Sequence, residues 1–194
     1  MRKEEIRREM SARPHPGPEV RRRVVQHVER WLRDRSPSVV VGFLAMGDEI
    51  DMTPLVDALP EVQFGLTRTS PGVTLTVHTF DGPREQHPYG FEQPAVDAPI
   101  IPVKTIDVVL VPGLAFSFDG RRLGRGAGYY DRFLVTVEAT KIGLTTSDRL
   151  RADIPLEPHD VKMDWIATED GVFEVSPPRS EEHTSELQSH KLIS

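Results

Sequence analysis

The sequence contains no cysteine among its 194 residues. This absence excludes disulfide bonds, thiolate metal sites and a cysteine nucleophile, and it is consistent with a reducing compartment. Long apolar runs are also missing, because the longest, residues 39–46, is far too short to span a bilayer. The first residues, MRKEEIRREM, are too charged for a signal peptide. We therefore expect a cytoplasmic protein that does not associate with membranes.

Two common phosphate-binding motifs are absent as well. A GxGxxG pattern that began at Gly124 would need glycine at the position where Tyr129 stands, and GxxxxGK[ST] occurs nowhere in the chain. These absences exclude a standard dinucleotide-binding turn and a standard P-loop. The chain also shows no internal repeats.

Positive charge is scarce outside the N-terminal segment. The net charge is −6, yet residues 1–35 carry 11 Lys and Arg against 6 Asp and Glu. No interleaved aromatic residues or nucleic-acid motif accompany this basic segment, and the acidic remainder would repel a polyanion. We therefore expect small-molecule substrates and no nucleic-acid partner. A monomer is the expected state.

Hydrophobic patterning predicts alternating strands and helices. The nearly continuous apolar runs 38–46 and 106–116 are typical of strands buried on both faces of a parallel sheet. We expect an α/β fold, a single three-layer domain over residues 1–178, with a mostly parallel or mixed central sheet and helices on both faces. The other predicted strands are 61–69, 73–81, 141–146 and 164–169, and the predicted helices are 2–12, 19–33, 51–59 and 129–139.

The C-terminal segment 179–194 has no apolar periodicity. It looks like the in-frame translation of a common sequencing-library adapter, which predicts a non-native segment without fold or function. A natural disordered tail is the alternative.

The stretch GRGAGYYDRF, residues 124–133, places three glycines at alternate positions ahead of a predicted helix. Glycine lets a ligand approach main-chain N–H groups closely, and a helix start favours anions. Arg121, Arg122 and Arg125 would add positive charge. An ordinary tight turn explains three glycines equally well, so the residues alone leave both interpretations open.

A longer stretch around this loop, VPGLAFSFDGRRLGRGAGYYDRFL at 111–134, strongly resembles the signature of the 5-formyltetrahydrofolate cyclo-ligase family, also called 5,10-methenyltetrahydrofolate synthetases. Three further segments support the resemblance, which covers roughly residues 3–175: KEEIRREMSAR at 3–13, MGDEIDMTPLV at 46–56 and PLEPHDVKMD at 155–164.

The resemblance implies an enzyme that uses ATP and Mg²⁺ to convert 5-formyltetrahydrofolate to 5,10-methenyltetrahydrofolate through an N5-iminium phosphate, with ADP and phosphate released. Such a reaction needs positioning and charge neutralisation and no protein nucleophile, in agreement with the lack of cysteine. Two rivals stay open: a non-catalytic folate- or nucleotide-binding paralogue, and an enzyme of related fold that acts on sugar phosphates or CoA esters.

The resemblance also implies the residues of the site, with Tyr129 and Arg125 at the point of phosphoryl transfer. Asp131 and Asp164 match the magnesium positions, although a helix first-turn acid favoured by the dipole also explains Asp131. The implied ATP-binding residues are Lys3, Arg7, Arg122, Leu123, Gly124, Arg125, Gly126, Ala127, Gly128, Tyr129 and Tyr130. The implied folate-binding residues are Leu44, Met46, Glu49, Arg125, Gly126, Ala127, Gly128 and Tyr129.

Several positions carry weaker expectations. Core packing explains Leu44 as well as a folate wall does, and a structural hydrogen bond explains His159 better than a catalytic base. Glu92 and Gln93 fit loop structure, while Arg68 stands where the family often carries a basic residue, toward the glutamate tail or a phosphate. After KIGL the family commonly shows an aromatic residue and glutamine, whereas residues 145–148 here are TTSD, which puts the nearby pocket wall in doubt.

Overall fold

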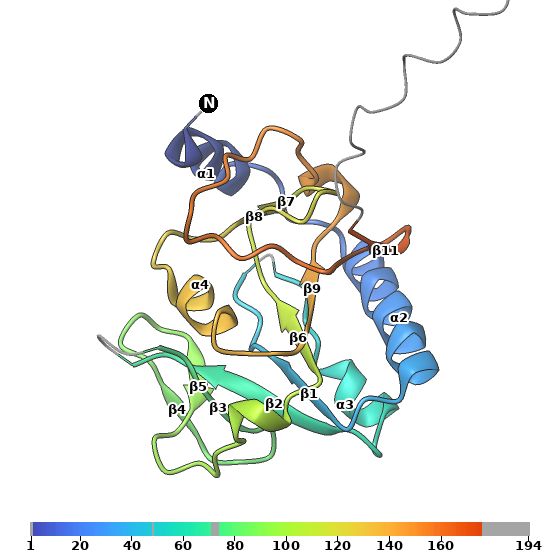
Figure 1. The fold of residues 1–194 in the computed structure, drawn as a ribbon, viewed down its shortest axis with the longest axis vertical. Coiled ribbons are helices and arrows are strands. Elements are labelled where there is room, and N and C mark those ends of the chain that lie inside the picture. The colour runs from blue at the N-terminus through green and yellow to red at the C-terminus, as the bar shows by residue number, and fades with distance from the viewer. Residues whose placement is uncertain (1, 48, 71–73, 176–194) are drawn as a thin grey trace, which may run out of the picture.

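The computed structural model describes residues 2–47, 49–70 and 74–175, and its centre is a seven-stranded sheet (Figure 1). The strand order is β11-β10-β9-β6-β1-β2-β3. The bounds of these strands are β1 (Val39–Gly42), β2 (Gln63–Arg68), β3 (Thr76–Thr79), β6 (Val108–Val111), β9 (Thr140–Leu144), β10 (Trp165–Thr168) and β11 (Gly171–Glu174).

The five inner strands are parallel, and the two edge strands, β3 and β11, are antiparallel to their neighbours. All residues of β1 and β6 are buried, as their continuous valine-rich runs predict for strands covered on both faces. The expected mixed sheet is therefore confirmed.

Helices cover both faces of the sheet, which confirms the three-layer arrangement. The helices α2 (Pro18–Arg35) and α3 (Pro54–Ala58) pack on one face, where Val28, Leu32 and Leu55 meet Val40 and Leu110. The short helix α4 (Tyr129–Leu134) packs on the other face, where its residues Phe133 and Leu134 belong to the cluster that contains Val41, Val109 and Val111.

The helix α1 (Lys3–Ser11) packs outside these layers. Its buried residues Ile6 and Met10 pack with Leu114, Ala115 and Leu123. The last two belong to the small hairpin of β7 (Ala115–Phe116) and β8 (Arg122–Leu123), and Figure 1 shows α1 near this hairpin. The N-terminal segment is thereby fixed next to the residues that precede the glycine loop.

The sequence did not predict the small elements. They are the two hairpins β7–β8 and β4 (Arg84–Gln86)–β5 (Glu92–Pro94), the edge strand β11, and the single 3₁₀ turns η1 (Val103–Thr105) and η2 (Ser147–Arg149). Each runs for only two to four residues. Such lengths give too few positions for a hydrophobic period to be read.

The helix predicted over 129–139 ends at Leu134, five residues early. The hydroxyl of Thr136 donates to the carbonyl of Phe133, and this local hydrogen bond competes with continuation of the helix. The predicted domain boundary at 178 and the segment 179–194 lie outside the described residues. Within the described part of the chain, no helix combines the length and the apolar composition needed to cross a bilayer.

Candidate active site

A cavity of about 470 Å³ opens at the carboxyl ends of the central parallel strands. The strand β1 lies between β6 and β2, so the segments that leave β1 and β6 diverge and a crevice opens there. The parts of the chain that line it are α1, the segments after β1 and β6, the end of β2, Leu75 ahead of β3, the β4–β5 hairpin, the run from β8 into α4, and the loop 157–160.

The glycine loop takes a backbone that its glycines permit. Gly126 and Gly128 have φ angles of 108° and 69°, in the left-handed region that side chains disfavour. Gly128 is the residue that precedes the first turn of α4. The carbonyl of Gly124 accepts a hydrogen bond of 3.0 Å from Nε of Arg7 in α1. The loop is thus shaped by its glycines and joined to the basic N-terminal helix.

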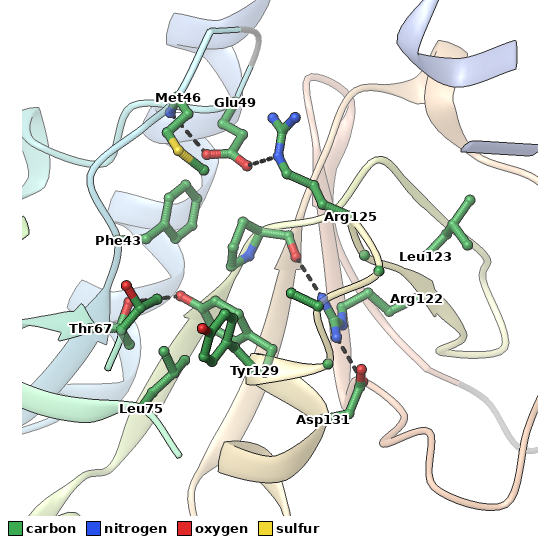
Figure 2. A pocket seen from close by; sticks show the side chains of 18 of the residues that line it. Phe43, Met46, Glu49, Thr67, Leu75, Arg122, Leu123, Arg125, Tyr129 and Asp131 are labelled. Carbon is green, nitrogen blue, oxygen red and sulfur yellow. Dashed lines mark hydrogen bonds and ion pairs between the residues drawn. The ribbon is translucent and has the colours of Figure 1, made fainter. Parts of the chain in front are cut away.

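Arg122 is the most buried of the cations in the cavity, with 6% of its side chain exposed. Its Nη2 lies 2.7 Å from Oδ1 of Asp131, and its Nη1 donates to the carbonyl of Pro112 at 3.2 Å (Figure 2). The guanidinium also lies 5.6 Å from the ring centre of Tyr130. Asp131 therefore pairs with a buried arginine and faces the cavity, which a helix dipole alone would not require.

Lys3 forms the second buried cation pair. Its Nζ contacts both carboxylate oxygens of Asp160 at 2.8 and 2.7 Å and the carboxylate of Glu157 at 3.0 Å. Lys3 and Asp160 each expose only 10% of their side chains. Because Lys3 belongs to α1 and Asp160 to a loop near the C-terminus, this pair closes one end of the cavity.

Glu49 and Arg125 form the third pair. Oε1 of Glu49 lies 3.2 Å from Nε of Arg125, and Oε2 accepts the N–H of Met46 at 2.9 Å (Figure 2). The Glu49 side chain is 8% exposed and that of Arg125 is 46% exposed, so the carboxylate is fixed and the guanidinium reaches solvent. Leu44 and Met46 are half-buried on the cavity wall, and neither belongs to the core clusters.

The two tyrosines of the loop differ in their surroundings. Tyr129 lines the cavity, and the guanidinium of Arg132 lies 5.2 Å from its ring centre. The hydroxyl of Tyr130 lies 3.1 Å from the hydroxyl of Thr67. Burial raises the pKa of Tyr130 well above its ordinary value, and the charge of Glu49 raises it further. Tyr130 therefore remains a neutral phenol at physiological pH.

The structure does not bring Asp164 to this cavity. Asp164 directly precedes β10, and its Oδ2 accepts the N–H of Lys141 at 2.8 Å beside the first residues of β9. Parallel strands present their amino ends at one edge of a sheet and their carboxyl ends at the other, so Asp164 lies at the wrong edge to share an ion with Asp131. The sequence-based expectation for Asp164 does not fit this geometry.

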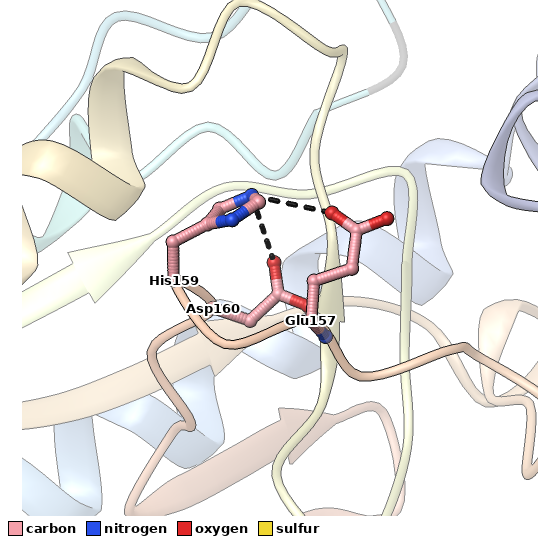
Figure 3. A group of neighbouring side chains, drawn as sticks. All are labelled: Glu157, His159 and Asp160. Atoms are coloured by element: carbon pink, nitrogen blue, oxygen red, sulfur yellow. Dashed lines mark hydrogen bonds and ion pairs between the residues drawn. The ribbon is translucent and has the colours of Figure 1, made fainter.

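Asp160, four residues earlier, lines the cavity where Asp164 was expected to act. Glu157, His159 and Asp160 each offer a ligand atom within 4.8 Å of the others, and Figure 3 shows them turned toward one another. His159 is 70% exposed, and its Nε2 lies 3.2 Å from the carboxylate of Glu157. Within the described residues the contacts of the His159 ring are thus with the carboxylates of Glu157 and Asp160.

Comparison with known proteins places the chain in a family. The sequence pattern of the 5-formyltetrahydrofolate cyclo-ligase family matches residues 2–169. The chain belongs to this family.

Similar proteins include 5-formyltetrahydrofolate cyclo-ligases of two bacteria. The one from Mycolicibacterium smegmatis is 46% identical over 85 residues, which are 41% of this chain and 43% of that protein. The one from Escherichia coli K12 is 28% identical over 152 residues, 70% of this chain and 80% of that protein. The matched region thus spans less than half the length of the first of these relatives.

Solved structures of the family share the fold. The 5,10-methenyltetrahydrofolate synthetase of Aquifex aeolicus superposes with a TM-score of 0.76 at 28% identity, over 96% of this chain and all of that one. The synthetase of Mycoplasma pneumoniae gives a TM-score of 0.67 at 18% identity, over 86% of this chain and 96% of that one.

In this cyclo-ligase family member, most of the residues named from the motifs line one cavity. The implied ATP and folate residues all do so, although the Leu123 side chain is also buried against α1. Sequence reasoning missed Asp160, Thr67 and the aromatic side chains of the β4–β5 hairpin. The motif EPHD, residues 157–160, contains Asp160, but the metal position was assigned to Asp164 instead.

The hairpin β4–β5 adds a wall of His87, Tyr89 and Phe91, and the rings of His87 and Phe91 stack with centres 4.3 Å apart. Gln93 is 4% exposed and ties this hairpin to the sheet: its Oε1 accepts from the N–H and hydroxyl of Thr69, and its Nε2 donates to Glu85.

Arg68 of β2 also joins the hairpin to the sheet, because its Nη2 lies 2.6 Å from Oε1 of Glu85 in β4. Residues 145 and 146, where the family commonly differs, are buried threonines that line a much smaller cavity, of about 10 Å³, that also touches Glu49.

Proposed function

We propose that this chain catalyses the ATP- and Mg²⁺-dependent cyclisation of 5-formyltetrahydrofolate to 5,10-methenyltetrahydrofolate, with ADP and phosphate as products. One observation carries the proposal: a single cavity joins a cationic corner, built from the glycine loop with Lys3 and Arg122, to an apolar and aromatic wall with one fixed carboxylate, Glu49. Such a cavity suits a polyphosphate at one end and a flat heterocycle at the other.

The chemistry needs activation of a poor leaving group. The formyl oxygen attacks the γ-phosphorus of ATP, the bond to the bridging oxygen breaks and ADP leaves, which gives an N5-iminium phosphate. N10 then bonds to the activated carbon and loses its proton, and phosphate departs with the former formyl oxygen as the ring closes. No covalent bond to the protein forms at any step, so the protein contributes positioning and charge.

The cationic corner fits the transferred phosphoryl group. Arg122 offers a planar fork and Lys3 a point charge, and both side chains are nearly buried, so their charges act in a medium that screens them little. Gly126 and Gly128 let the phosphates approach the loop backbone. Arg125 and Tyr129 would stand at the boundary between the two substrates, where they orient the formyl oxygen and the phosphoryl group.

The carboxylates of the cavity fit a magnesium ion. Asp131 and Asp160 line the same cavity, both are hard oxygen donors, and both have a cationic partner that a phosphate would compete for. We infer that these two residues would hold Mg²⁺, with Glu157 beside Asp160. When bound, the ion neutralises charge on the phosphates and polarises them.

Glu49 fits the folate end. Its carboxylate is fixed by the Met46 N–H and is able to accept hydrogen bonds from the N–H groups of a pterin. Leu44 and Met46 supply apolar wall on the same side. Arg125, which pairs with Glu49 across the mouth of the cavity, would then join the folate end to the glycine loop.

The test is incubation with 5-formyltetrahydrofolate and MgATP, with the near-ultraviolet absorbance of the methenyl product followed alongside phosphate release. We expect both signals in a one-to-one ratio. Arg122→Gln should reduce turnover on the order of a hundredfold, since it removes a donor aimed at developing charge. Arg121→Gln is the matched control, because its Nη1 bonds the Ile154 carbonyl outside the cavity. Ligand binding without either signal would favour a non-catalytic folate- or nucleotide-binding protein.

A further inference from the structure

Thr67 occupies a position in the cavity that no motif predicted. It stands at the carboxyl end of β2 and lines the cavity on the side of the apolar wall. Its hydroxyl lies 3.1 Å from the hydroxyl of Tyr130. This contact joins the sheet to the first turn of α4 across 63 residues of sequence.

Tyr130 is the middle of a chain of contacts. On one side its hydroxyl bonds Thr67, and on the other its ring lies beneath the Arg122 guanidinium, 5.6 Å from ring centre to Cζ. Phe133 packs edge-on against the same ring, with centres 6.4 Å apart. Phe133 supports one side of the Tyr130 ring. The hydrogen bond between the Tyr130 hydroxyl and Thr67 restrains the remaining tilt of the ring.

The Tyr130 ring is one of three contacts of the Arg122 guanidinium. Two of its nitrogens bond Asp131 and the Pro112 carbonyl, while its Nε is buried and has no hydrogen-bond partner among the described residues. The remaining face of the guanidinium rests over Tyr130. A tilt of the ring would therefore remove the support beneath the guanidinium and leave its position to the two hydrogen bonds alone.

We propose that Thr67 is a positioning residue: through the Tyr130 hydroxyl it fixes the Arg122 guanidinium in the cationic corner. The inference rests on the proposed function for its catalytic consequence. It adds a residue of the central sheet to the cationic corner, whose other residues come from α1, β8 and the glycine loop. Thr67 thereby connects the apolar wall proposed for folate to the Arg122 guanidinium proposed for the phosphates of ATP.

The first test measures binding of Mg²⁺ with inorganic triphosphate by calorimetry, which needs no turnover. Thr67→Val keeps shape and removes the hydroxyl, and Tyr130→Phe removes its partner. We expect each to weaken binding about fivefold, the effect of one hydrogen bond. We expect the double variant to match either single one and Thr67→Ser to restore binding. Additive losses, or unchanged affinity in Thr67→Val, would overturn the proposal, because Thr67 would then act without Tyr130.

The second test is kinetic. If Thr67 acts on Arg122, Thr67→Val should alter kcat or the KM for ATP and leave the KM for 5-formyltetrahydrofolate unchanged. A rise confined to the folate KM would contradict the proposal and place Thr67 against the substrate directly. The control Thr140→Val replaces a half-buried strand threonine outside the cavity and should leave all three values unchanged. If the wild-type protein makes no methenyl product, the proposed function fails while calorimetry still decides the role of Thr67.

Discussion

Each buried cation described in the cavity carries a carboxylate partner. Arg122 pairs with Asp131, and Lys3 pairs with Asp160. An uncompensated buried charge is costly, and each pair offsets that cost. The residues proposed for phosphate and those proposed for metal are therefore in contact with one another.

Substitution of two aspartates, Asp131 in the cavity and Asp164 outside it, tests which of them serves catalysis. We expect Asp131→Asn to lower Mg²⁺-dependent turnover on the order of a hundredfold, since it removes a charge proposed to hold the metal at the phosphates. We expect Asp164→Asn to keep turnover within about twofold, as a substitution remote from the site. Initial rates over a magnesium titration measure both. Equal losses in the two variants would contradict the assignment of Asp131.

At the scale of elements, α1 contributes both packing and charge. Ile6 and Met10 are fully buried beside the β7–β8 hairpin, and Lys3 reaches the loop 157–160. Burial alone would raise the pKa of Asp160, but hydrogen bonds from Lys3 and the Glu157 N–H outweigh it and hold that pKa below its ordinary value of 3.8.

This lowered pKa predicts an acid-sensitive attachment of α1. Ionised Asp160 contributes stability that is fully present above pH 3.8 and is lost as the pH falls through the lower folded-state pKa. We therefore expect the melting temperature to fall more steeply in the wild type than in Lys3→Met as the pH falls below 3.8. Calorimetric scans over this range measure it.

The control for this experiment is Lys104→Met, which changes an exposed lysine of η1. It should follow the wild-type pH profile. Parallel profiles for the wild type and Lys3→Met would show that the Lys3–Asp160 pair does not set the acid sensitivity.

For the molecule as a whole, the paired cavity predicts coupling between metal and polyphosphate. Triphosphate alone must break the ion pairs of Lys3 and Arg122 in order to bind these cations. Mg²⁺ alone must break the same ion pairs in order to bind the carboxylates. Together they satisfy both sets at once. We expect the rise in melting temperature with Mg²⁺ and triphosphate together to exceed the sum of the separate rises. Additive shifts in a thermal scan would contradict this coupling.

The sequence predicted the large features of the fold for a physical reason. Buried strands such as β1 and β6 need unbroken apolar runs, and α2 needs a long periodic stripe, so both leave a readable pattern. The short hairpins leave none. The alternate glycines of residues 124–128 made an anion-binding loop one of two interpretations, and this loop does line the cavity.

The sequence could not tell which acid of the C-terminal motif faces the cavity. Asp160 and Asp164 differ by four positions, and only the start of β10 at Trp165 decides that Asp164 lies at the amino edge of the sheet. Thr67 was missed for a similar reason, because its partner Tyr130 is 63 residues away and no local pattern records that contact.

The Lys3–Asp160 pair joins residues 157 positions apart, nearly the whole described length of the chain. Contacts of such long range form late, because the entropy of closing the intervening loop must first be overcome. A chain still leaving the ribosome therefore lacks the Lys3–Asp160 pair until residue 160 has emerged. The full set of groups proposed for magnesium and phosphate would come together only after that point.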